Sequence, residues 1–78
     1  MIFARRLISQ GRTRQFCVER DTAMGWTARE EEDNQIVRVT RFRDWHRVEQ
    51  VITMFDLKAS MLREEGWHEV ALTSPFSP

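Results

Sequence analysis

The residue types best suited to metal binding or nucleophilic chemistry are few in this chain and widely spaced. His46 and His68 are the only histidines, and Cys17 is the only cysteine. No two of them have the spacing of a zinc site, and no base close in sequence could activate the Cys17 thiol. We therefore expect no enzyme, no metal site and no cofactor, and we interpret Cys17 as a buried structural residue.

An acidic run over residues 30–33 is the next candidate for a cation site. Calcium-binding loops space their acidic ligands at alternate positions and need a glycine for the central turn. The run Glu-Glu-Glu-Asp has neither feature. We interpret it as the charged tip of a hairpin, which discourages pairing with other strands.

Arginine is the charged residue that gathers in a way that could bind a ligand. The candidate anion or nucleic-acid surface consists of Arg29, Arg38, Arg41, Arg43, Arg47 and Trp26. An open antiparallel sheet face that carries arginines and aromatic rings is typical of several small modules that bind single-stranded nucleic acid. The alternative is that nearby acids such as Glu19 and Glu31 neutralise the arginines, and the zero net charge of the chain favours this alternative.

The segment that carries most of these arginines reads as strands. Residues 14–20, 26–32 and 36–42 each alternate between two faces, with Asp33-Asn34 as a hairpin turn between the last two. We predict a three-stranded antiparallel meander over residues 14–42. With a two-residue turn, Ala28 would lie opposite Val39, and Arg29 opposite Arg38. Such a like-charge pair is unfavourable unless acids or a bound anion neutralise it.

Residues 44–65 are predicted to form one long helix. Asp44 is a good N-cap, and Gly66 stands where a residue with positive φ ends a helix. Apolar residues recur at spacings of three and four, which is the period of a helix that buries one face. The predicted core stripe is Trp45, Val48, Val51, Ile52, Phe55, Ala59 and Leu62.

A second apolar patch on the same helix lies outside the core stripe. It consists of Met54, Leu57 and Met61. A helix of about 21 residues is roughly 32 Å long, whereas a strand of about seven residues spans roughly 23 Å. We therefore expect the helix to overhang its sheet. The patch would need a cover, supplied by residues 1–10, by residues 67–76 or by another chain.

The remaining segments are short. We interpret residues 1–13 as an N-terminal arm or short helix, with an edge strand as the alternative. Residues 67–78 are expected to form a short strand and a frayed tail. The fold class predicted is α+β: one domain over residues 1–78, with a three-stranded antiparallel sheet, extended by that short fourth strand, and one long C-terminal helix on one face. In the order of its elements, three strands followed by a helix, the chain resembles small modules that bind single-stranded DNA. The resemblance is limited to this order.

A chain of 78 residues buries a small core, and self-association is a common remedy. No stretch is apolar for long enough to span a bilayer, and we expect no secretory leader and no membrane contact. We predict a small, non-enzymatic cytoplasmic protein that acts as a self-associating interaction module, either as a homodimer or with another protein. The alternative function is binding of single-stranded nucleic acid through the arginine-bearing face.

Overall fold

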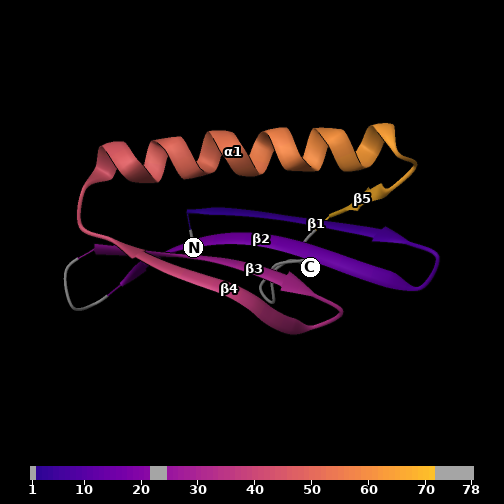
Figure 1. The fold of residues 1–78 in the computed structure, drawn as a ribbon, viewed down its shortest axis with the longest axis horizontal. Coiled ribbons are helices and arrows are strands. Elements are labelled where there is room, and N and C mark those ends of the chain that lie inside the picture. Colours follow the sequence, from indigo (N-terminus) through magenta and orange to yellow (C-terminus); the bar gives the residue numbers. More distant parts are fainter. Residues whose placement is uncertain (1, 22–24, 72–78) are drawn as a thin grey trace, which may run out of the picture.

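One curved antiparallel sheet and one helix make up the two layers of the fold (Figure 1). A computed structural model describes residues 2–21 and 25–71. The elements are β1 (Phe3–Ser9), β2 (Arg12–Asp21), β3 (Gly25–Glu32), β4 (Gln35–Phe42), α1 (Trp45–Glu64) and β5 (His68–Val70). The strand order across the sheet is β4-β3-β2-β1-β5. The α+β class is confirmed, but the described residues form five strands, whereas three or four were predicted.

Strand β1 replaces the N-terminal arm or short helix that was expected over residues 1–13. It pairs antiparallel with β2 on one side and with β5 on the other, so it is an inner strand. Gln10 and Gly11 form the turn to β2 with φ values of 49° and 78°. Two consecutive residues with positive φ fit a type I′ hairpin turn. Gly11 therefore turns a hairpin, and the prediction of a helix here was wrong because β2 and β5 supply partners for an extended segment.

The hairpin of β3 and β4 turns at Asp33 and Asn34, as predicted, with φ values of 52° and 67°. Its register is not the predicted one, because a β-bulge falls between Glu30 and Glu31. Ala28 therefore pairs with Thr40 and not with Val39. The expected like-charge pair of Arg29 and Arg38 is absent.

Helix α1 begins and ends at local signals. The Asp44 carboxylate accepts a hydrogen bond of 3.0 Å from the backbone N–H of His46. At the other end Gly66 has a φ of 104°, and the N–H of Trp67 donates to the carbonyl of Leu62 at 3.0 Å. This pattern closes the last helical turn with a left-handed residue. The observed helix, Trp45–Glu64, lies within the predicted range of residues 44–65.

The core lies between α1 and the middle of the sheet. Phe55 is central, since its ring centroid is 6.1 Å from that of Phe3 and 5.2 Å from that of Phe16. The buried apolar residues of this cluster are Leu7, Phe16, Val18, Ala28, Val48, Phe55, Ala59 and Leu62. They come from the three inner strands and one helix stripe, so α1 covers β1, β2 and β3 more fully than it covers β4.

The helix does not overhang the sheet, which corrects another expectation. Strand β2 has 10 residues and α1 has 20. At about 3.3 Å per strand residue and 1.5 Å per helical residue, both elements are roughly 30 Å long. Figure 1 shows α1 running beside the strands over their length. The second apolar patch must therefore be exposed for a reason other than helix length.

Candidate interaction surface

The outer stripe of α1, formed by Met54, Leu57 and Met61, lies open to solvent. Met54 is 53% exposed, Leu57 60% and Met61 52%. At about 100° per residue, all three point roughly 100–160° around the helix axis from Phe55, which faces the core. The outer stripe is therefore exposed because its side chains point away from the sheet around the helix axis. Neither β1 nor the described part of the chain after α1 covers it.

A groove lies between the outer stripe and β4. It has a volume of about 160 Å³ and is lined by Thr40 and Phe42 from β4 and by Val51 and Met54 from α1. The groove exists because α1 leans over β1, β2 and β3, so the helix-side face of β4 has little above it. A surface of this kind, apolar and recessed beside an exposed apolar stripe, suits contact with a protein.

A buried charged group forms one wall of this groove. The Glu30 carboxylate accepts a hydrogen bond of 2.8 Å from Lys58 Nζ on α1. Its second oxygen lies 3.7 Å from Arg38 Nε on β4. Glu30 is only 6% exposed, so its charge needs these partners. The three side chains tie β3, β4 and α1 together beside the groove.

Strand β4 is an edge of the sheet and is exposed on both faces. Ile36, Val37 and Val39 are each at least half exposed. Within the described residues, β4 pairs only with β3, so the backbone groups of its outer side have no strand partner. An exposed apolar edge of this kind is a template for pairing with another strand.

The candidate anion surface is divided by the fold. Because of the bulge, Arg38 shares the helix-side face with Glu30, while Arg29 and Arg41 project from the opposite face. Arg29 Nη2 donates to Glu19 Oε1 at 3.0 Å, and Arg29 Nε lies 3.8 Å from Glu31 Oε2. Burial acts to lower the pKa of Arg29, but a hydrogen bond to Cys17 and the charges of Glu19 and Glu31 together raise it above its ordinary value. The acids therefore neutralise Arg29 within the fold.

The other members of that candidate surface are also dispersed. Arg41 lies 3.9 Å from Asp21. Arg43 and Arg47 are exposed near the start of α1 and have no ion pair among the residues that the structure describes. Trp26 is on the helix side, and its ring packs on Trp45 at 5.3 Å. Trp26 thus does not lie on the sheet face that carries Arg29.

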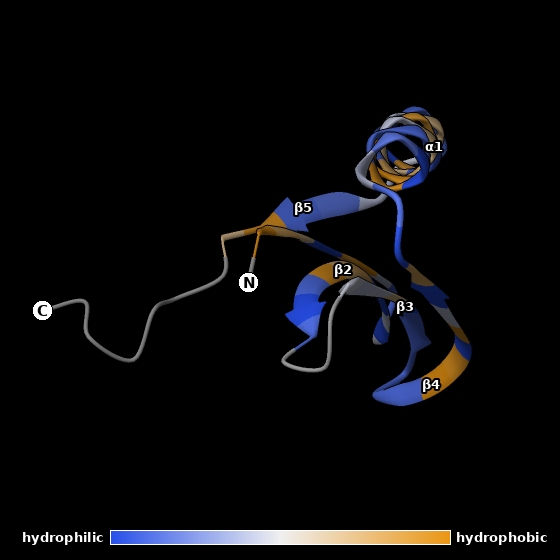
Figure 2. Ribbon diagram, turned by 90° about the vertical axis from the view of Figure 1, so that its left-hand side faces the viewer, coloured by the Kyte–Doolittle hydropathy of each residue, from blue (hydrophilic) through white to orange (hydrophobic). Residues whose placement is uncertain are grey.

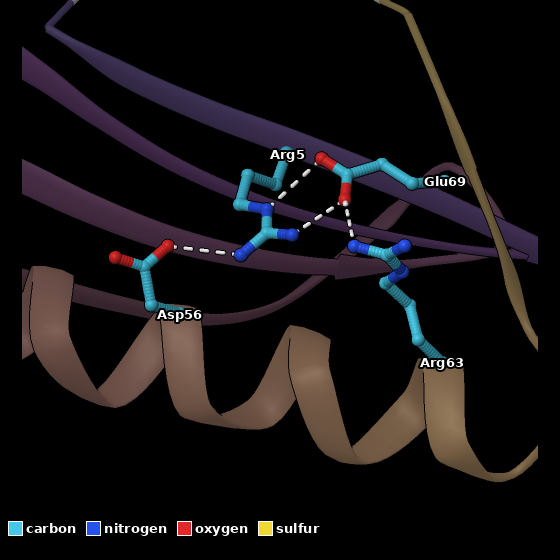
Figure 3. A network of polar contacts seen from close by, with 4 residues as sticks. All are labelled: Arg5, Asp56, Arg63 and Glu69. Atoms are coloured by element: carbon cyan, nitrogen blue, oxygen red, sulfur yellow. Dashed lines mark hydrogen bonds and ion pairs between the residues drawn. The ribbon is translucent and has the colours of Figure 1, made fainter.

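A second ion-pair network holds β5 and α1 to β1 (Figure 3). Arg5 Nε donates to Glu69 at 2.9 Å, and Arg5 Nη1 donates to Asp56 at 2.9 Å. Arg63 Nη1 lies 3.9 Å from Glu69. The hydrogen bonds from Arg5 lower the pKa of Glu69 below its ordinary value. The hydrogen bond to Glu69 likewise raises the pKa of Arg5. This network is structural, because each member joins two elements of the fold.

The sequence indicated the outer stripe but not the groove or its charged wall. Glu30 shares a strand face with Trp26 and Ala28, so it alternates with core residues. A carboxylate at such a position needs a buried cation, and this signal could have led to Lys58. The exposed edge formed by Val39 and its neighbours could not have been found in this way, because strand order decides which strand is an edge.

Other kinds of site find no support in the described ranges. No three potential ligands among His, Cys, Asp and Glu gather there closely enough to hold a metal ion. Cys17 is fully buried and accepts a hydrogen bond of 3.1 Å from Gln15 Nε2. In residues 2–21 and 25–71 no helix has the length and apolar character needed to cross a bilayer. Comparison with protein-family models, curated proteins and solved structures finds no match to this chain.

Proposed function

We propose that this protein is an interaction module that self-associates as a homodimer through the outer stripe of α1. The observation that carries this proposal is the exposure of Met54, Leu57 and Met61, each more than half exposed on one side of a helix. Burying one large apolar side chain is worth about 1.5–3 kcal/mol. A 78-residue chain with a small core gains considerably by covering three of them.

The pattern along the outer stripe supports a helix as the partner. The stripe extends in both directions at alternating spacings of three and four, as Arg47, Gln50, Met54, Leu57, Met61 and Glu64. All six are exposed. This is the spacing at which two helices interlock side by side. We call this longer row the seam.

The ends of the seam support a second copy of this chain as the partner. A cation, Arg47, stands near the N-terminal end of α1, and an anion, Glu64, stands at its C-terminal end. If two copies of α1 pair in antiparallel orientation, Arg47 of each copy lies near Glu64 of the other, and Met54 lies near Leu57. A parallel pair would place Arg47 of one copy beside Arg47 of the other, and the two like charges would repel. The antiparallel pair also places opposite ends of the helix dipoles together, and it is self-complementary, as a twofold interface requires.

The distribution of charge favours self-association over nucleic-acid binding. A nucleic-acid surface needs several unpaired cations along one path. Arg29, Arg38 and Arg41 each lie within 4 Å of an acid, and they project from two faces of the sheet. Trp26 packs on Trp45 instead of standing free to stack on a base.

The test is the molar mass of matched variants by light scattering. Met61→Glu places a carboxylate in the seam, whereas Ser60→Glu places the same charge on the neighbouring residue, which is also exposed but lies about 100° away around the helix. The wild-type protein and Ser60→Glu should show about twice the 9.4 kDa chain mass. Met61→Glu should weaken the dimer at least about tenfold, or roughly 1.4 kcal/mol.

Two results would refute the proposal. One is a wild-type protein with the mass of a single chain at every concentration up to about 1 mM, which corresponds to an association weaker than about 4 kcal/mol. The other is a wild-type dimer that Met61→Glu and Ser60→Glu weaken equally, since the contact would then lie elsewhere.

A further inference from the structure

Strand β4 and α1 lie on the same side of the molecule. Figure 2, viewed along the helix, shows both at the right-hand side, with β5 on the other side. The groove joins them, because Thr40 and Phe42 of β4 face Val51 and Met54 of α1 across it. A second copy that covers the outer stripe therefore approaches β4 as well.

The two edges of the sheet differ in how they are protected. Strand β5 has only three residues, and His68 and Glu69 make it polar. Strand β4 has eight residues and exposes Ile36, Val37 and Val39. Proteins commonly protect sheet edges by keeping them short or by placing charges on them. By this criterion β5 is a protected edge and β4 is open to pairing.

The charges and the bulge of β4 do not close this edge. Arg38 lies 3.7 Å from Glu30, and Arg41 lies 3.9 Å from Asp21, so both arginines have acidic partners on the inner strands. The register shift falls between Glu30 and Glu31, near the start of β4. The pairing of Arg38 to Phe42 with β3 is regular. The regular part includes Arg38, Val39 and Thr40 at the middle of β4, where another strand can pair.

One twofold axis can relate both contacts. In the antiparallel pairing of α1, the axis passes between the two helices, level with the midpoint between Met54 and Leu57. The lining of the groove runs from Val51 to Lys58 on α1 and from Arg38 to Phe42 on β4, so the middle of the helix lies level with this half of β4. An axis that passes beside α1 at this level therefore passes beside the middle of β4, and antiparallel helices and antiparallel strands require the same kind of axis.

We propose that β4 pairs antiparallel with β4 of the second copy, so that the two five-stranded sheets become one continuous sheet with both helices on one face. This inference rests on the proposed self-association. In an antiparallel pair, opposed residues share a face, so the register centres on a residue. We place Val39 opposite Val39 of the second copy, which buries two exposed β-branched side chains against each other. Arg38 then lies opposite Thr40, and no arginine opposes another.

The experiment is disulfide cross-linking, under mild oxidation, of variants that each carry one cysteine in addition to the native Cys17. Val39→Cys brings two thiols together in this register, with Cα atoms about 4.5–5.5 Å apart, within the range of a disulfide. Ile36→Cys is the matched control, since Ile36 is on the same strand and equally exposed. In the proposed register Ile36 lies roughly 20 Å from Ile36 of the second copy, which is too far. The unsubstituted protein, in which Cys17 is buried, is the blank.

We expect Val39→Cys to form a cross-linked dimer at least about tenfold faster than Ile36→Cys, and we expect added Met61→Glu to abolish the difference. If light scattering shows a dimer but the two cysteines cross-link at the same rate, the β4 pairing is wrong while the self-association through α1 stands. If light scattering shows single chains throughout, the proposed function itself fails, and the β4 pairing fails with it.

Discussion

Lys58 Nζ on the helix lies 2.8 Å from Glu30 Oε1 on β3, at the wall of the groove that adjoins the outer stripe. The Glu30 side chain is 8% exposed, while Lys58 keeps about a third of its side chain in solvent. The lysine stem thus spans the groove wall and brings its charge to a buried acid. This contact ties α1 to β3 beside the uncovered strand β4, where a second copy would meet the surface.

Removal of Lys58 should therefore destabilise the fold. We expect Lys58→Met to lower the free energy of unfolding by about 2 kcal/mol, because the buried Glu30 carboxylate then keeps only Arg38 as a cation. The double variant Lys58→Met with Glu30→Met should recover much of this loss, since no buried charge remains. Urea unfolding followed by tryptophan fluorescence, at one fixed protein concentration, measures both values. A double variant no more stable than the single one would contradict the role of Glu30.

The Arg5 network predicts a pH dependence with a definite sign. The hydrogen bonds from Arg5 hold the pKa of Glu69 in the folded protein below its ordinary value of 4.5. The stabilisation is therefore fully present above pH 4.5 and is lost as the pH falls through the lower, folded-state pKa. Because Glu69 is partly exposed, we expect Glu69→Gln to cost no more than about 1 kcal/mol at pH 7.

When unfolding is measured between about pH 7 and pH 3, the cost of Glu69→Gln should stay constant down to about pH 4.5 and shrink below it, as the acid protonates. Glu49→Gln, on an exposed helical position without an ion pair among the described residues, is the control. It should change the stability little at either pH. A cost of Glu69→Gln that stays constant over this range would show that Arg5 does not hold the Glu69 carboxylate.

A charge exchange tests the antiparallel direction of the helix pair. We expect Arg47→Glu alone to weaken the dimer by roughly 3- to 10-fold. The new carboxylate of each copy would then lie beside Glu64 of the other, and an exposed charge pair is worth up to about 1 kcal/mol. Glu64→Arg alone should act in the same way. Neither change harms the isolated helix, since an acid near the N-terminus and a base near the C-terminus suit the helix dipole.

The double variant Arg47→Glu with Glu64→Arg should restore the wild-type dissociation constant, measured by sedimentation equilibrium. In a parallel dimer Arg47 would lie beside Arg47 of the other copy, and Glu64 beside Glu64. The double variant would then show no such recovery relative to the single variants. Restoration therefore distinguishes the two directions of pairing, independently of the cross-link at Val39.

Local signals in the sequence determined the helix, its limits and one of the turns. Asp44 and Gly66 mark the ends of α1 because capping involves neighbours in the chain only. Asp33 and Asn34 mark the β3–β4 turn because few residues adopt positive φ at low cost. The period of the helix likewise separated the buried Val48, Phe55, Ala59 and Leu62 from the outer stripe. Trp45, also predicted for the core stripe, is 45% exposed, so that part of the prediction was wrong. Each of these features is set by interactions within a few residues.

Only the tertiary structure decided the features that depend on which strands are neighbours. Residues Phe3–Ser9 form a strand because β2 and β5 flank them, and the bulge at Glu30 places Arg38 beside an acid and away from Arg29. The sheet order leaves β4 at an edge, and the course of α1 over the inner strands leaves that edge uncovered. Pairing of strands joins residues distant in the chain, and its energy depends on both partners, so alternation within one segment cannot determine it.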